Sequence, residues 1–168
     1  TGWAPFRDGY WTWMTPWGWT WVDAAPWGFA PSHYGRWVFL GGRWGWCPGA
    51  FVARPFWSPA MVGWVGGAGW GLSLTFGAPV YGWVPLAWGE PFRPWWGNCS
   101  FRCWTHYNRP YAVRTEEQVW RNPPSRFQNI DRPGGITAVP GAAFTGSRPV
   151  SRNIVPVNAS QIAATPVL

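Results

Sequence analysis

Glycine and proline recur along the whole chain and confine it to short segments of regular structure. The 168 residues include 22 Gly and 19 Pro. Glycine destabilises helices and strands through its backbone entropy, and proline lacks the amide hydrogen that a helix interior requires. We therefore expect no long helix. A transmembrane helix is also not predicted, because no run of about 18 apolar residues is free of Gly, Pro and Arg.

Aromatic residues alternate with other residues in two pairs of short arms. The first pair is Gly9–Trp13 with Trp17–Trp21, and the second is Gly35–Phe39 with Trp44–Trp46. Alternation with a period of two predicts β-strands. The gaps contain proline in the first pair and two glycines in the second, as expected where a hairpin reverses. The sequence therefore predicts two β-hairpins that form an internal repeat.

Further short strands are predicted after the second hairpin. Met61–Val65 and Tyr81–Leu86 have the composition of strands, and Gly69–Phe76 lies between them. The total is roughly six to eight short strands. We predict an all-β fold in which antiparallel short-strand hairpin repeats form a small sheet, sandwich or barrel.

Composition divides the chain into two regions. Of the 19 Trp, 18 lie in residues 1–104, which we interpret as a Trp/Gly-rich β-repeat domain. Residues 105–168 form an Arg/Pro-rich extended C-terminal tail or arm. Within it Thr115–Asn122 is predicted to make two helical turns, and Gly135–Pro140 and Arg152–Val157 to add edge strands. Alternatively, roughly the last 40 residues order only on a partner.

The positive charge is spread thinly. The formal net charge is +7, and all 13 basic residues are Arg. Residues 1–104 carry six Arg against three acids, the rest carry seven against three, and no run of like charges occurs. A nucleic-acid binder usually has a clustered basic patch. Isolated Arg among aromatic residues favours cation–π stacking and backbone hydrogen bonds, so no nucleic-acid partner is predicted.

Three cysteines leave one unpaired if a single disulfide forms. We favour a local Cys99–Cys103 bridge, with Cys47 as a buried free thiol or an alternative partner. The alternative is a Cys3His metal site that adds His106. Its spacing lacks the Cys-x2-Cys knuckle, and an oxidising compartment would favour a disulfide over thiolate ligands. No metal is predicted.

Residues suited to catalysis are scarce. The chain has two His and six acids, and no carboxylates pair at a suggestive spacing. Glu116 and Glu117 are adjacent, so their side chains diverge on any regular element. Since no nucleophile–base or acid–base signature is present, we predict no catalytic residues and no cofactors.

The tryptophans are too many to be buried together. In residues 1–104, 29 positions are aromatic, and each Trp can bury about 150–250 Å². Some rings should therefore contact a sugar ring, a lipid interface or another copy of the chain. The six candidates for such stacking contacts are Trp17, Trp19, Trp44, Trp46, Trp95 and Trp96. The first four could instead form one aromatic ladder that joins the two hairpins. Since Trp95 and Trp96 are adjacent, we expect only one of them to point inward from an extended chain.

Several strings resemble a known family. Trp27–Trp37, Arg43–Trp46 and Val80–Leu86 carry the pattern of the tryptophan-rich Tyr-x-Trp-Gly-x-Trp repeat proteins. These are secreted or envelope proteins of Gram-negative bacteria, some associated with FecR-like domains. The resemblance implies a secreted, cell-surface or periplasmic location, and it carries over no catalytic residue. Cys47 and the Cys99–Cys103 insert depart from the family pattern.

These features predict a non-enzymatic extracellular or cell-envelope structural module. It would self-associate, or bind another envelope protein, into a fibre or surface assembly through exposed aromatics and the C-terminal arm. The first alternative is a polysaccharide-binding module with Trp stacking platforms, and the second is an enzyme of unknown type. A concave row of exposed aromatic rings would favour the polysaccharide, and a flat edge would favour another copy.

Overall fold

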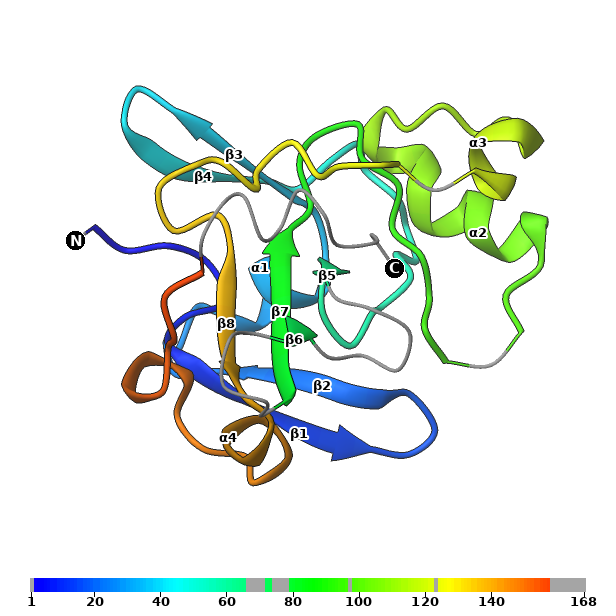
Figure 1. Cartoon of the computed structure of the whole chain (residues 1–168). Coiled ribbons are helices and arrows are strands. Elements are labelled where there is room, and N and C mark those ends of the chain that lie inside the picture. Colours follow the sequence, from blue (N-terminus) through cyan, green and yellow to red (C-terminus); the bar gives the residue numbers. More distant parts are fainter. Residues whose placement is uncertain (1, 66–71, 74–78, 97, 123, 158–168) are drawn as a thin grey trace.

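The computed structural model describes residues 2–65, 72–73, 79–96, 98–122 and 124–157 (Figure 1). Strands in small antiparallel sheets form most of the body, and short helices flank them. The strands are β1 (Gly9–Met14), β2 (Gly18–Asp23), β3 (Arg36–Leu40), β4 (Arg43–Cys47), β5 (Val62–Val65), β6 (Leu72–Ser73), β7 (Pro79–Pro85) and β8 (Thr137–Pro140). The helices are α1 (Phe29–His33), α2 (Phe101–Asn108), α3 (Glu117–Arg121) and α4 (Gly141–Thr145), with 3-10 turns η1 (Arg109–Tyr111) and η2 (Val150–Arg152).

Strands β1 and β2 form the first predicted hairpin. In their antiparallel register Trp11 lies opposite Trp21, and Trp13 lies opposite Trp19. All four rings share one face of the ribbon, as the alternation predicts. Trp11 and Trp21 are buried, whereas 62% of Trp13 is exposed. The hairpin therefore buries its base and presents aromatic rings near its turn.

Strands β3 and β4 form the second predicted hairpin. Leu40 pairs with Arg43, and Gly41 and Gly42 between them have φ values of +55° and +77°. Positive φ at both central positions is typical of the type I′ turn, whose twist matches that of the flanking strands. Both predicted hairpins are confirmed, each as a separate two-stranded sheet.

Strand β7 is the centre of the third sheet. Strands β5 and β6 pair with successive parts of it, and β8 pairs along Val80–Trp83. The strands predicted over Met61–Val65 and Tyr81–Leu86 correspond to β5 and β7. The strand predicted over Gly69–Phe76 lies outside the described residues, apart from the short β6.

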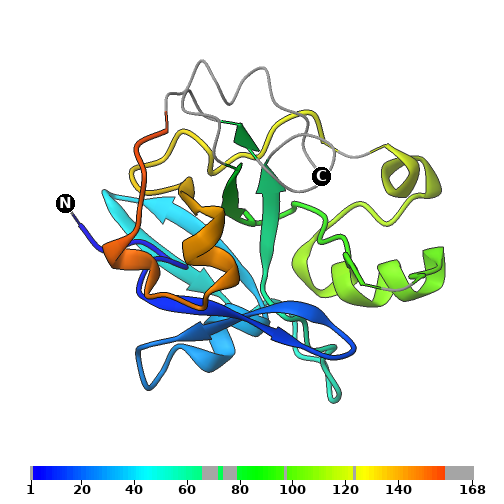
Figure 2. The ribbon, with the colours of Figure 1, turned by 60° about the horizontal axis from the view of Figure 1, so that its bottom comes forward.

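A cluster of aromatic rings fills the core where the sheets meet. Trp11 contacts Trp64, Trp83 and Phe144 at centroid distances of 4.8, 5.2 and 5.6 Å. Phe144 belongs to α4, which lies against β1 (Figure 2). Aromatic pairs in tilted or edge-to-face geometry each add about 0.5–1.5 kcal/mol beyond their burial. Residues from both ends of the chain therefore build one core.

The C-terminal region differs from the extended tail expected over residues 105–168. Phe127, Ile130, Phe144 and Val150 are buried in the main core. Their apolar surface leaves water when they pack on the sheets, which an extended arm would not achieve. The described part of this region therefore folds onto residues 1–104.

Of the three elements predicted within the tail, two agree with the structure and one does not. The helix predicted over Thr115–Asn122 corresponds to α3, and the edge strand over Gly135–Pro140 corresponds to β8. Arg152–Val157 is not a strand. It begins at the end of η2 and makes one backbone hydrogen bond to β8, from Val155 N to Ala138 O at 2.9 Å.

Helix α2 also departs from the expected all-β class. The Ser100 side chain accepts a hydrogen bond from the amide of Cys103 and caps the helix. Trp104, Tyr107 and Asn108 bury its inner face. The fold is therefore mainly β with helices, and the described strands do not close into a barrel. Within the same residues, no helix has the length and apolarity needed to cross a membrane.

Candidate functional site: an aromatic groove beside α2

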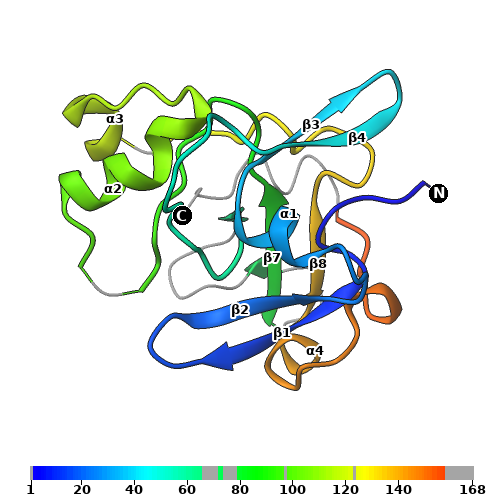
Figure 3. The ribbon, with the colours of Figure 1, turned by 180° about the vertical axis from the view of Figure 1, so that it is seen from behind.

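The segment that follows β4 borders an open groove. Figure 3 shows this segment, in cyan and teal, leaving β4 toward α2. The wide part of the groove has a volume of about 380 Å³ and is lined by Tyr34, Trp46, Phe51 and Tyr111. A narrower part of about 80 Å³ lies against α2. Val52, Pro55 and Tyr111 line both parts, so the two hollows lie next to each other.

The rings of the wide part differ in how firmly they are held. The Trp46 indole Nε1 donates a hydrogen bond to the Tyr34 carbonyl at 2.9 Å. The Tyr111 hydroxyl accepts a hydrogen bond from the Gly35 amide at 3.2 Å. The Phe51 side chain has no polar atom that could form such a hydrogen bond, and it is 94% exposed. The groove therefore has a fixed aromatic floor and one freely accessible ring at its edge.

A cationic side chain, Arg54, borders the narrow part. Arg54, Phe56, His106 and Tyr107 line it, and the Phe56 and His106 rings lie 5.2 Å apart. Neither part of the groove has a carboxylate among its described lining residues. The groove thus combines apolar rings with positive charge at one end.

A buried arginine supports the groove from below. Arg36 is fully buried, and its guanidinium lies 4.3 Å from the centroid of the Tyr111 ring. It donates hydrogen bonds to the Glu90 carbonyl at 3.0 Å and to Asn108 Oδ1 at 2.9 Å. Burial lowers the pKa of Arg36 to about 10, against the opposing influence of Tyr111 and Glu90. Arg36 therefore stays charged at neutral pH and ties β3 to α2.

Two further buried polar groups complete this network. The Glu90 carboxylate accepts hydrogen bonds from the amides of Ala87 and Gln128. Burial raises the pKa of Glu90, while these amides and the charge of Arg36 oppose the rise. Asn108 donates to the carbonyls of Phe92 and Trp104. Because buried polar groups destabilise a protein when they lack partners, this network fixes the position of α2 against the sheets.

The predicted stacking residues of the first hairpin lie away from the groove. Trp17 is partly exposed and contacts the Trp57 ring at 5.1 Å. Trp19 is half-buried and contacts Phe144 at 4.6 Å and Trp13 at 5.5 Å. Trp19 therefore packs on the core, and Trp17 stays available at the surface.

In the second hairpin, one predicted residue belongs to the groove. Trp46 lines it, whereas Trp44 packs on Phe39 at 5.3 Å and donates from Nε1 to the Pro133 carbonyl. Neither ring contacts the tryptophans of the first hairpin among the described ring pairs. The prediction of one aromatic ladder that joins the two hairpins is therefore wrong, because the hairpins belong to separate sheets.

Trp95 and Trp96 both pack on the core, although each is half-buried. Trp95 contacts Trp64 at 5.4 Å, and Trp96 contacts Tyr107 at 6.1 Å. Phe92 contacts both rings, at 5.7 and 5.9 Å. The expectation that only one of them points inward is wrong, because the chain here is not a regular strand and α2 offers a second packing surface.

The cysteines and the other histidine take no part in the groove. Cys99 and Cys103 form a disulfide at the start of α2, and Cys47 is a free cysteine. No cluster of three or more His, Cys, Asp or Glu suited to a metal lies in the part of the chain that the structure describes. His33 is buried, its Nδ1 lies 2.7 Å from the Ser58 carbonyl, and burial lowers its pKa.

Sequence reasoning missed most of the groove. Tyr34 lies within the string that carries the family resemblance, but no sequence pattern predicts that its ring lines a groove. Phe51 and Phe56 lie outside the alternating arms, and Tyr111 comes from the expected tail. Only a contact between segments about 65 residues apart brings Trp46 and Tyr111 together, and no local pattern predicts such a contact.

The fold and the groove define a small, mainly β protein with an aromatic surface depression. Residues 1–90 match the model of a family of unknown function, DUF6600, and the chain belongs to this family. The match includes both hairpins and the loop of the groove, whereas α2 and η1 lie beyond it. Neither a curated protein nor a solved structure matches the chain. The resemblance to the Tyr-x-Trp-Gly-x-Trp repeat proteins stays a prediction.

Proposed function

We propose that this protein is a non-catalytic binding module that holds a polysaccharide chain in the aromatic groove. The observation that carries the proposal is the aromatic lining of the two adjacent hollows, from Phe51 at the open edge to Phe56 beside α2. The C–H face of a sugar ring stacks on aromatic rings, whose faces are electron-rich. A row of rings in a depression suits a chain of such units.

The polar groups of the groove fit the same ligand. Tyr34 presents a half-buried phenol, and Arg54 presents an exposed guanidinium with several donors for sugar hydroxyls. Glycoside hydrolysis usually requires two carboxylic groups at the bond that breaks. The described lining has none, which supports binding without hydrolysis.

A glycan array followed by titration of intrinsic Trp fluorescence tests this function, because Trp46 lies in the groove. The informative variant is Phe51→Ala, since a ring that is 94% exposed contributes little to folding. Its control is Leu40→Ala, which removes a 73% exposed side chain at the β3–β4 turn. We expect Phe51→Ala to weaken glycan binding and Leu40→Ala to leave it unchanged. Equal binding by both variants, or no binding glycan on the array, refutes the proposal.

Self-association is a second candidate, supported by the tip of the β1–β2 hairpin. Residues 9–22 contain no charged side chain, and Trp13, Met14 and Trp17 are exposed there. Exposed Trp is typical of contacts between protein chains. Sedimentation velocity at increasing concentration tests this candidate with Trp13→Ser as the variant. A chain that stays monomeric at high concentration refutes it.

We also propose that the protein resides outside the cytoplasm, in the periplasm or at the cell surface. The Cys99–Cys103 disulfide supports this location, because such bonds persist in oxidising compartments. Fractionation of the source cells with detection of the full-length protein tests it, and recovery with cytoplasmic markers overturns it.

A further inference from the structure

Helix α2 presents a row of basic side chains beside the narrow part of the groove. Arg102, His106 and Arg109 are all exposed, and their spacing places them on one side of the helix. Arg109 keeps helical dihedral angles as the C-cap of α2, so the row continues into η1. His106 itself lines the narrow part of the groove, together with Arg54. Three arginines and one histidine therefore gather around the end of the groove next to α2.

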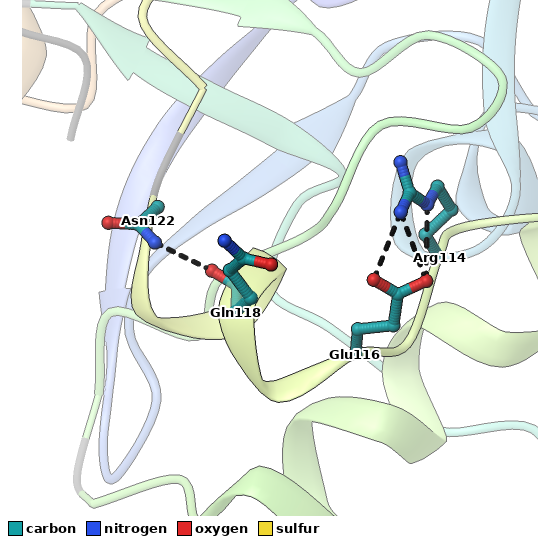
Figure 4. Close-up of polar contacts among 4 residues, drawn as sticks. All are labelled: Arg114, Glu116, Gln118 and Asn122. Carbon is teal, nitrogen blue, oxygen red and sulfur yellow. Dashed lines mark hydrogen bonds and ion pairs between the residues drawn. The ribbon is translucent and has the colours of Figure 1, made fainter.

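The acids of the neighbouring helix are already paired. On α3 and just before it, Glu116 binds Arg114 and Glu117 binds Arg121 (Figure 4 shows the first pair). The third ion pair of the described residues, between Arg126 and Asp131, also leaves the α2 row unpaired. Arg54, Arg102 and Arg109 have no carboxylate partner within the described chain. Their positive charge is therefore available to a ligand.

We propose that the polysaccharide bound in the groove is anionic, with carboxylate or sulfate groups that pair with Arg54, Arg102 and Arg109. This inference rests on the proposed function and names the chemical class of its ligand. Arginine presents a planar fork of donors that matches the geometry of such acidic groups. The sugar rings stack in the wide part, and their acidic groups meet the basic row at the narrow part.

The distribution of charge favours a polysaccharide over a single-stranded nucleic acid. The wide part, around Tyr34, Trp46 and Phe51, has no cation among its described lining residues. A nucleic acid carries a phosphate at every nucleotide and requires positive charge along its whole track. A polysaccharide with acidic groups on some of its units requires positive charge only at intervals. The groove has that arrangement.

Removal of the basic row tests the inference. The variant is Arg102→Gln with Arg109→Gln, since glutamine retains a high helix propensity. Its control is Arg148→Gln with Arg152→Gln, which removes the same net charge at exposed positions near η2. Binding is measured by Trp fluorescence with an oligouronate, a sulfated oligosaccharide, a neutral oligosaccharide and an oligothymidylate.

We expect the wild type to prefer one of the acidic oligosaccharides at low salt. The α2 variant should lose roughly threefold to thirtyfold in affinity for it, and the control variant should bind as the wild type does. The oligouronate and the sulfated ligand distinguish the two sources of charge. Equal affinity for neutral and acidic chains, or equal losses in both variants, overturns the inference but leaves the proposed function intact. Oligothymidylate bound as tightly as the acidic oligosaccharides overturns the choice of ligand class, and the absence of any glycan binding refutes the proposed function itself.

Discussion

Replacement of Arg36 by methionine tests whether the buried polar network holds α2 and the groove in place. Methionine approximates the length of the side chain but cannot donate hydrogen bonds. The change removes the bonds to the Gly35 carbonyl at 2.9 Å, the Glu90 carbonyl at 3.0 Å and Asn108 Oδ1 at 2.9 Å. It also removes the cation above the Tyr111 ring and the positive charge that opposes the raised pKa of the buried Glu90.

The size of the expected loss of stability follows from the polar groups that Arg36→Met leaves without partners. A hydrogen bond from a charged donor contributes about 1.5–3 kcal/mol, and the desolvation of the guanidinium offsets much of that sum. Removal of one member of a buried charged network usually costs about 3–5 kcal/mol. For a chain of this size that corresponds to a decrease in Tm of roughly 6–20 °C.

Chemical denaturation followed by Trp fluorescence measures the loss, with Arg43→Met as the control. Arg43 lies on the paired strand β4 and is exposed, so its loss should stay within about 0.5 kcal/mol. A double-mutant cycle with Asn108→Leu should show that the two substitutions are not additive. A loss below about 1 kcal/mol for Arg36→Met, or additive effects within about 0.5 kcal/mol, would refute the reasoning.

Three further predictions concern the sheets, a histidine and the disulfide. Gly63→Ala should destabilise the protein by about 1–3 kcal/mol, because the added Cβ would overlap the Phe127 ring. The control Gly45→Ala should be tolerated, because its Cβ would lie 3.7 Å from its nearest neighbour. Equal urea midpoints for the two variants would contradict this prediction. Because burial lowers the pKa of His33, the unfolded chain binds more protons, so stability should fall as pH drops below about 6.5. His33→Asn should flatten this decline in denaturation series at different pH values, and an unchanged slope would argue against it. Reduction of the Cys99–Cys103 disulfide should lower the free energy of unfolding by at most about 2 kcal/mol, because the loop that it closes is short. Chemical denaturation with and without dithiothreitol measures this difference, and a larger value would contradict the prediction.

The two hairpins could be predicted from sequence because their determinants are local. Alternation places Trp11 and Trp13 on one face, and Gly41 and Gly42 permit the positive φ values that the second turn requires. Neither property depends on the rest of the chain. The same reasoning could not decide how far each ring is buried, since Trp11 is covered by Phe144 from a segment more than 100 residues away.

Helix α2 and its network could not be predicted from sequence. The helix depends on the Ser100 cap and on the burial of Trp104 and Tyr107, and these contacts form only when the helix docks. No local pattern around Arg36 or Asn108 indicates that they are buried and hydrogen-bonded to each other, because burial depends on the tertiary fold.

The sequence by itself determined that the chain would form short aromatic hairpins, because period-two alternation and turn residues act over a few positions. It also determined that aromatic rings would remain at the surface, since their number exceeds what one core can hold. Only the tertiary structure decided which rings those are. The groove joins Trp46 and Phe51 to Tyr111 and sets them beside the basic row of α2, because packing between distant segments controls both burial and proximity.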